Sequence, residues 1–142
     1  MNSFLLNGSS KLFVGLLAVT FLTPLLAQEG DAKRGEVVFK QCAICHQVGP
    51  MSGNGIGPNL MGVLNRKMGS APDFSYATGL QKAAQAGMYW DEEKVFNWLA
   101  DPQTYIKRVV NDDSVTSKMP VKVSDEQARR DVIAYIAMLS KK

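Results

Sequence analysis

The strongest constraint on the fold of this chain is a run of five residues, Cys42-Ala43-Ile44-Cys45-His46. The run contains both cysteines and the single histidine of the 142-residue sequence. Two thiols and an imidazole placed this close together can form a disulfide, bind a metal ion, or hold a cofactor. Each possibility predicts a different kind of protein.

The residues around the motif favour a cofactor. Redox enzymes use a Cys-x-x-Cys disulfide, but thioredoxin-like oxidoreductases carry it after a β-strand, and no strand pattern precedes Gln41. A structural zinc ion needs four ligands, and the motif offers three, with a carboxylate as a conceivable fourth. Cys-x-x-Cys-His is the attachment signature of c-type haem, in which both thiols form thioethers and the histidine ligates the iron. We therefore expect one haem c, covalent through Cys42 and Cys45, with His46 as iron ligand; a disulfide or thiol pair is the alternative.

The N-terminal segment predicts export. Residues 12–26 are an uncharged apolar run, shorter than the roughly 20 residues of a membrane-spanning helix and typical of a secretory signal. We expect a signal peptide at residues 1–27, cut after Ala27, a single domain at 28–142, and a periplasmic location. A retained N-terminal anchor is the alternative, because Leu25 is larger than the residue preferred at that position of a cleavage site.

The charge balance argues against nucleic acid as a ligand. Sixteen basic and thirteen acidic side chains give a net charge of +3, and no run of Lys and Arg forms a basic patch. We expect no nucleic-acid partner.

The apolar pattern predicts an all-α domain with unusually long loops. Helices are expected at 31–41, 91–100 and 124–139, each with capping or acidic residues in its first turn. The sequences of residues 48–62, 66–75 and 111–120 are typical of loops, because glycine, proline and polar residues dominate them. Loops of this length inside a compact domain need something to pack around, and a large rigid cofactor would provide it.

Counting restricts the second axial ligand of the expected iron. His46 is the only histidine, so a second histidine is excluded, and a methionine sulfur becomes the leading candidate. Met119 lies in a polar loop between two expected helices, far along the chain from His46, whereas Met138 falls in the last expected helix, where packing is the usual role. We expect His46 and Met119 to ligate the iron; an open position or a lysine remains possible.

Six segments, in this order, resemble class I cytochromes c, and among them the soluble bacterial cytochrome c2 type. They are "GEVVFKQCAICH", "GIGPNL", "NRKMGSAPDFSY", "YWDEEKVFNWLADP", "SKMP" and "DVIAYIAML". The resemblance implies the cytochrome c fold, with three to five helices and long loops wrapped around one covalently bound haem c.

The resemblance also implies individual roles. Gly35 and Phe39 would meet Tyr135 where the first and last helices cross. The cofactor-binding residues would include Pro58, whose carbonyl orients His46, and three residues around a haem propionate: Arg66, Tyr76 and Trp90. Trp98 replaces a tyrosine of many relatives near the methionine sulfur, and Leu80 replaces an asparagine.

A haem with both axial positions filled predicts an electron carrier and no enzyme, because oxygen and peroxide find no open site. The expected donor is a complex such as cytochrome bc1, and the acceptor an oxidase or a photosynthetic reaction centre. A monomer would dock transiently through the haem edge beside Cys45, ringed by Lys40, Lys118 and Lys122. The rival hypotheses are a haem enzyme or sensor that opens its sixth position, and a thiol-disulfide protein without haem.

Overall fold

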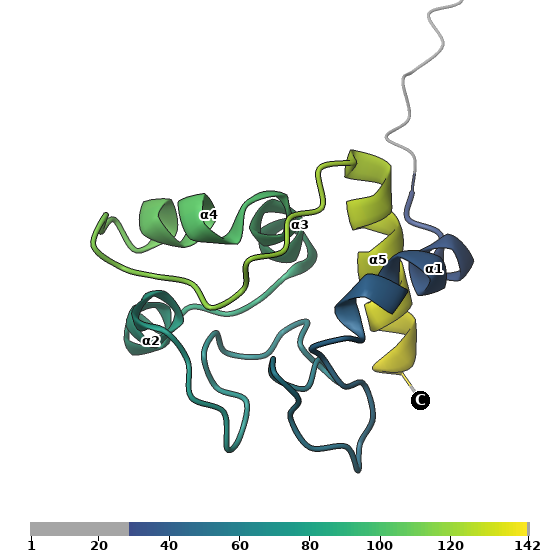
Figure 1. Cartoon of the computed structure of the whole chain (residues 1–142), viewed down its shortest axis with the longest axis horizontal. Coiled ribbons are helices and arrows are strands. Elements are labelled where there is room, and N and C mark those ends of the chain that lie inside the picture. Colours follow the sequence, from purple (N-terminus) through teal and green to yellow (C-terminus); the bar gives the residue numbers. More distant parts are fainter. Residues whose placement is uncertain (1–28, 142) are drawn as a thin grey trace, which may run out of the picture.

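The computed structural model describes residues 29–141. This part of the chain forms the helices α1 (Ala32–Cys42), α2 (Thr78–Gln85), α3 (Glu92–Ala100), α4 (Pro102–Val109) and α5 (Glu126–Leu139) (Figure 1). Its only strand-like contact is an isolated bridge between Lys67 and Tyr89. The all-α prediction is therefore confirmed, while the predicted signal peptide at 1–27 lies outside the described residues.

Aspartates start most of the helices. In each case the carboxylate accepts a hydrogen bond from the backbone N–H three residues further on, which satisfies a donor that has no partner inside the helix. The capping residues are Asp31 of α1, Asp91 of α3, Asp101 of α4 and Asp125 of α5. The three helices predicted from the sequence begin and end within about two residues of α1, α3 and α5, which is the usual uncertainty of a helix boundary.

Two helices, α2 and α4, were not located from the sequence. The predicted helix 91–100 is α3, which ends at Ala100, and Pro102 is the first residue of α4. Proline is favoured at this position because the first N–H of a helix has no partner inside the helix. Helix α2 begins after Ala77 with no side-chain cap, so the sequence carries no start signal there.

Helices α1 and α5 cross at a glycine. A Cβ at Gly35 would lie 1.9 Å from the carbonyl oxygen of Asp131, so only glycine allows the two helices to approach this closely. One turn later, the rings of Phe39 and Tyr135 pack with their centroids 5.3 Å apart. The predicted contact between the first and last helices is confirmed.

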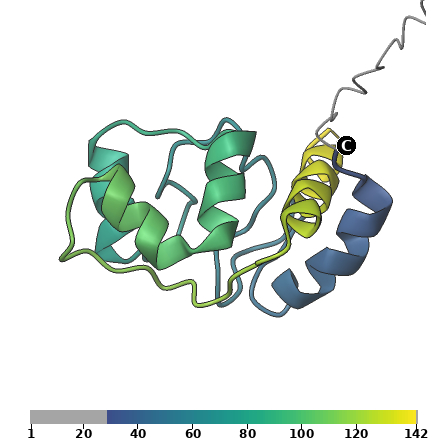
Figure 2. The ribbon, with the colours of Figure 1, turned by 90° about the horizontal axis from the view of Figure 1, so that it is seen from above.

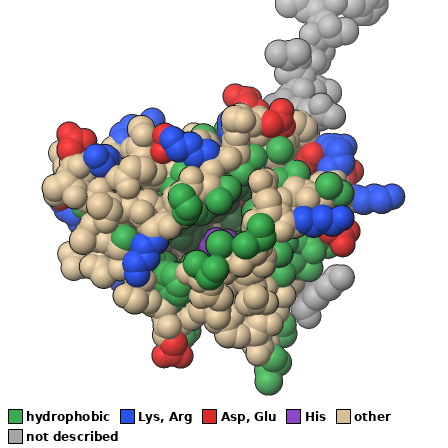
Figure 3. Space-filling model, viewed as in Figure 1, with side chains coloured by type: hydrophobic (Ala, Val, Ile, Leu, Met, Phe, Trp, Pro, Cys, Tyr) green, Lys and Arg blue, Asp and Glu red, His purple; other side chains and the backbone are tan. Residues whose placement is uncertain are grey.

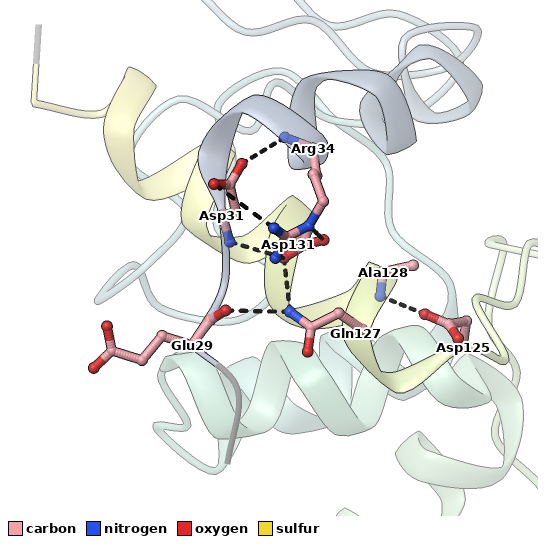
Figure 4. Close-up of polar contacts among 7 residues, drawn as sticks. All are labelled: Glu29, Asp31, Arg34, Asp125, Gln127, Ala128 and Asp131. Atoms are coloured by element: carbon pink, nitrogen blue, oxygen red, sulfur yellow. Dashed lines mark hydrogen bonds and ion pairs between the residues drawn. The ribbon is translucent and has the colours of Figure 1, made fainter. Parts of the chain in front are cut away.

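A buried carboxylate at the same crossing fastens the start of the domain to α5 (Figure 4). The side chain of Asp131 is only 5% exposed. It accepts hydrogen bonds from the Arg34 guanidinium at 2.7 and 2.9 Å, from the Asp31 backbone N–H at 2.8 Å, and from the Gln127 side chain at 2.8 Å. Gln127 also donates to the carbonyl of Glu29, so one network joins residues 29–34 to α5.

The helices form two groups that meet where α3 packs against α5. Figures 1 and 2 show α1 and α5 side by side on one side of the molecule, and α2, α3 and α4 together on the other. The core includes the fully buried Met68, Ile106 and Val132. No helix within residues 29–141 is long and apolar enough to cross a membrane.

Candidate functional site

The cysteine–histidine motif lies where α1 ends. The backbone N–H groups of Cys45 and His46 both donate to the Cys42 carbonyl, which folds the motif into a tight turn. Both thiols are half-buried and unbridged, and burial, with a smaller effect of the neighbouring Cys45, raises the pKa of Cys42. In the described part of the chain no three His, Cys, Asp or Glu side chains come together as a metal site.

The imidazole of His46 is held from two directions. Its Nδ1 lies 2.8 Å from the carbonyl oxygen of Pro58, and because a carbonyl can only accept, Nδ1 carries the proton and Nε2 keeps a free lone pair. Gly57 lies against the ring, where a Cβ would come within 2.5 Å of Cε1. Burial lowers the pKa of His46, although the bond to Pro58 opposes this. The ring is thus neutral, fixed in orientation, and able to donate electrons from Nε2.

Met119 lies in a loop that the rest of the protein holds in place. Ser117 N–H donates to the Gln103 side chain at 2.8 Å, and Val123 N–H donates to the Leu99 carbonyl at 2.8 Å. The indole N–H of the buried Trp98 donates to the Met119 sulfur at 3.1 Å. Trp98 is itself packed edge-on against Trp90, with ring centroids 5.3 Å apart.

Arg66, Tyr76 and Trp90 lie on connected pieces of chain. Arg66 donates to the Asn59 carbonyl at 2.9 Å, and its own carbonyl accepts from Trp90 N–H at 2.9 Å. Tyr76 accepts a hydrogen bond from Ala71 N–H at 3.1 Å, which leaves its hydroxyl hydrogen free to donate. Within residues 29–141, Arg66 has no acidic partner, although burial lowers its pKa. This donor set fits a negatively charged group.

The surface is hollowed at the histidine. Figure 3 shows a recess near the middle of one face, with the chain's single histidine in its floor and hydrophobic side chains along its rim. An apolar recess, a histidine with a free Nε2, two thiols and an arginine without an acid partner fit a flat apolar group that bears acidic substituents. Haem is such a group.

The sequence interpretation missed residues that hold the site loops. Asn59 donates from its side chain to the carbonyls of Gly49 and Ser52, and Gln103 bonds both Ser117 and Val115. The "GPNL" segment contained Asn59, but nothing local indicated which carbonyls its amide would reach.

The predicted rim lysines differ in their surroundings. Lys122 forms an ion pair with Asp101 at 2.7 Å, and the Lys118 ammonium donates to the Ser75 carbonyl at 2.5 Å. Lys40 is exposed and forms no ion pair within the described residues. One of the three charges is therefore largely neutralised by an acid of the same chain.

Comparison with known proteins gives a consistent result. The cytochrome c family model matches residues 32–140. Cytochrome c2 iso-2 of Rhodospirillum centenum is 39% identical over 119 residues, which cover 80% of this chain and 98% of that protein. A cytochrome c2 of Rhodopseudomonas palustris is 44% identical over 115 residues, covering 77% and 98%. The solved structure of cytochrome c2 from Rhodospirillum centenum aligns with a TM-score of 0.74 and 38% identity, over 78% of this chain and 99% of that one.

Proposed function

This chain belongs to the cytochrome c family, and we propose that it is a soluble periplasmic carrier that passes single electrons between membrane complexes. It carries one covalent haem c and takes part in electron transport. When bound, the haem supplies an iron atom that alternates between ferric and ferrous states, so one electron is gained or lost without bond breaking.

In this proposal four side chains hold the haem. Cys42 and Cys45 would form the thioethers to the haem, His46 would offer Nε2 to the iron, and Met119 would offer its sulfur as the other protein ligand. A thioether ligand favours the reduced iron and raises the potential, as suits a carrier. With His46 and Met119 both bound to the iron, oxygen and peroxide would find no open position, so the protein would act as a carrier and not as an enzyme.

One observation carries the proposal: each proposed ligand has its own protein hydrogen bond, placed so that a lone pair stays available. The Pro58 carbonyl holds His46 Nδ1 at 2.8 Å, and the Trp98 N–H meets the Met119 sulfur at 3.1 Å. A thioether sulfur has two lone pairs, so it can accept one hydrogen bond and still bind a metal. Such outer contacts orient metal ligands and tune the metal.

Three further residues are proposed to hold a haem propionate. Arg66 offers a half-buried cation without an acid partner, and Tyr76 offers a hydroxyl hydrogen that no residue in the described range accepts. No hydrogen bond within residues 29–141 uses the indole N–H of Trp90, which is available as a third donor. A propionate carboxylate in this position would accept charge-assisted hydrogen bonds from these donors.

The visible spectrum tests this proposal, with Met119→Leu as the key variant. We expect a six-coordinate low-spin iron with a methionine-to-ferric charge-transfer band, and we expect Met119→Leu to lose that band and lower the reduction potential. Leucine is nearly isosteric with methionine but has no sulfur, and Met138→Leu in α5 is the matched control that should keep the band.

Two results would contradict the proposal. A high-spin iron that binds carbon monoxide readily in the wild-type protein would favour a haem enzyme or sensor. Colourless protein from a host that matures c-type haem would favour a thiol-disulfide protein.

The location and partners belong to the same proposal. Cleavage after Ala27 would release a periplasmic domain, and N-terminal sequencing of the exported protein, with Gln28 expected first, tests this. The proposed donor is a complex such as cytochrome bc1, and the acceptor an oxidase or a photosynthetic reaction centre. A monomer would dock briefly at the haem edge beside Cys45, with Lys40, Lys118 and Lys122 at the rim.

A further inference from the structure

The loop between His46 and Pro58 contains Asn54-Gly55, the only Asn-Gly pair that follows the predicted signal peptide. In such a pair the backbone nitrogen of the glycine can attack the side-chain amide carbon of the asparagine, because glycine has no side chain to shield that nitrogen. The result is deamidation, one reason why asparagine is a thermolabile residue. Gly55 is exposed, and a Cβ at Gly53 would have no neighbour within 4 Å. The chain therefore has room to move on both sides of Asn54.

The side chain of Asn54 joins two loops. Its Nδ2 donates to the Pro72 carbonyl at 2.7 Å, and its Oδ1 accepts from the Asn59 backbone N–H at 2.9 Å. The second bond favours attack on the amide, because the Asn59 N–H would stabilise the negative charge that develops on Oδ1, as the donors of an oxyanion hole do. One contact opposes the reaction. Gly55 N–H donates to the Gly57 carbonyl at 2.9 Å, so the loop has to open locally before the nitrogen can react.

We propose that Asn54-Gly55 is a self-modification site, at which loss of the side-chain amide loosens the loop that orients His46. In the first step the Gly55 nitrogen loses its proton and bonds to Cγ of Asn54, while Nδ2 leaves as ammonia with that proton. The cyclic imide then takes up one water molecule. It opens either to aspartate or to isoaspartate, in which the main chain runs through the former side chain. The reaction needs only water, and the modification itself does not depend on the proposed function.

Deamidation would act on His46 through the residues that hold its ring. A carboxylate at position 54 has no hydrogen to donate, so the Pro72 carbonyl loses its partner. Isoaspartate also lengthens the backbone next to Gly55, where a Cβ would lie 2.5 Å from the Cys45 carbonyl oxygen. Residues 55–58, which contact and orient the imidazole, would therefore shift. The importance of this shift for an iron ligand rests on the proposed function.

Peptide mapping of aged holoprotein tests the modification. The protein is incubated in mildly alkaline buffer, and mass spectrometry locates each asparagine whose side-chain NH2 has become OH. We expect product at Asn54 at a rate within about tenfold of that in a free peptide of residues 50–60, because only local opening is required. Asn65 is the control in the same molecule: it is exposed, but an arginine follows it, and we expect about tenfold less product there. Asn54→Gln keeps an amide but would need a larger ring, and should give no product at this position.

Two aspartate variants test the consequence. Asn54→Asp reproduces one of the products. We expect the Gly57 N–H, which donates to the Cys45 carbonyl, to exchange with deuterium about tenfold faster in this variant, as measured by NMR on the reduced holoprotein. Asn65→Asp adds the same charge at an exposed position and should leave that exchange rate unchanged.

Three outcomes would overturn parts of the inference. If Asn54 reacts no faster than Asn65, or stays intact while the free peptide reacts to completion, the pair is not a self-modification site. An unchanged exchange rate at Gly57 in Asn54→Asp would overturn the link to His46. Product at Asn54 in a purified protein that carries no haem would support the modification site and overturn the proposed function, so the two can fail separately.

Discussion

Replacing Asp131 with asparagine tests how the two terminal helices are held together. The Asp131 carboxylate is nearly buried, and its hydrogen bonds to Arg34, with smaller contributions from Asp31 N–H and Gln127, lower its pKa from an ordinary 3.8 to about 2. One pKa unit corresponds to about 1.4 kcal/mol of difference between protonation states. The ionised carboxylate therefore stabilises the folded state by roughly 2 kcal/mol at neutral pH.

The sign of the pH dependence follows from the lowered pKa. A carboxylate whose pKa is lower in the folded state than in the unfolded state stabilises the fold fully when the pH is above the unfolded pKa, near 3.8. This stabilisation is lost as the pH falls through the folded pKa of about 2. Asp131→Asn should thus lower the free energy of unfolding by roughly 2 kcal/mol at pH 7 and by about half as much near pH 3. Denaturant unfolding of the holoprotein, followed by circular dichroism at both pH values, measures this difference.

Asp101→Asn is the matched control. The hydrogen bond from Lys122 lowers the pKa of Asp101 to about 2 as well, but this pair is on the surface, and asparagine can still cap α4. Its effect should be small and should disappear in high salt, since exposed ion pairs are screened. If Asp131→Asn lowers the free energy of unfolding by less than about 0.5 kcal/mol at pH 7, or by the same amount at pH 7 and pH 3, the carboxylate does not act as a charged link between the helices.

Two further substitutions test residues that contact the proposed iron ligands and position them. Gly57→Ala puts a methyl group 2.5 Å from His46 Cε1. We expect this variant to lose about 1–3 kcal/mol of stability and to have a changed visible spectrum. The control is Gly53→Ala, whose added methyl group would have no neighbour within 4 Å, and it should change neither property. Trp98→Phe removes the N–H that meets the Met119 sulfur. Because that bond withdraws electron density from the sulfur, we expect its loss to favour ferric iron roughly threefold to tenfold, lowering the potential by about 30–60 mV, with partial recovery in Trp98→Tyr. An unchanged potential in Trp98→Phe would refute this role.

The features that could be predicted from the sequence are those encoded locally. The helix starts at Asp31 and Asp91 and the cysteine–histidine turn each depend on residues close together in the chain. Helix α4 was missed because proline both ends a helix and begins one, and only the three-dimensional structure shows that Pro102 follows a capping Asp101. Local signals fail when a residue has two permitted roles.

Contacts between residues far apart in the sequence could not be predicted either, and the reason is different. Lys118 reaches the carbonyl of Ser75, 43 residues earlier, and Lys122 reaches Asp101, 21 residues earlier. The sequence shows where a lysine lies along the chain, but it does not show whether the ammonium group is free or paired. The pairing of Lys122 with Asp101 depends on how α4 and the Met119 loop pack in three dimensions.

The two chain segments that carry the proposed iron ligands are held by different parts of the protein. His46 is fixed by residues 55–58, whereas the Met119 loop is fixed by Gln103 and Leu99 of the α2–α4 group. Neither set of contacts involves the iron, so the protein itself positions both proposed ligands. An iron whose ligands are held in this way changes its surroundings little when it changes charge, because fixed dipoles have no need to reorient. A carrier that must be oxidised and reduced repeatedly needs this property, and Met119→Leu should accordingly alter the spectrum and the potential while leaving the rest of the fold in place.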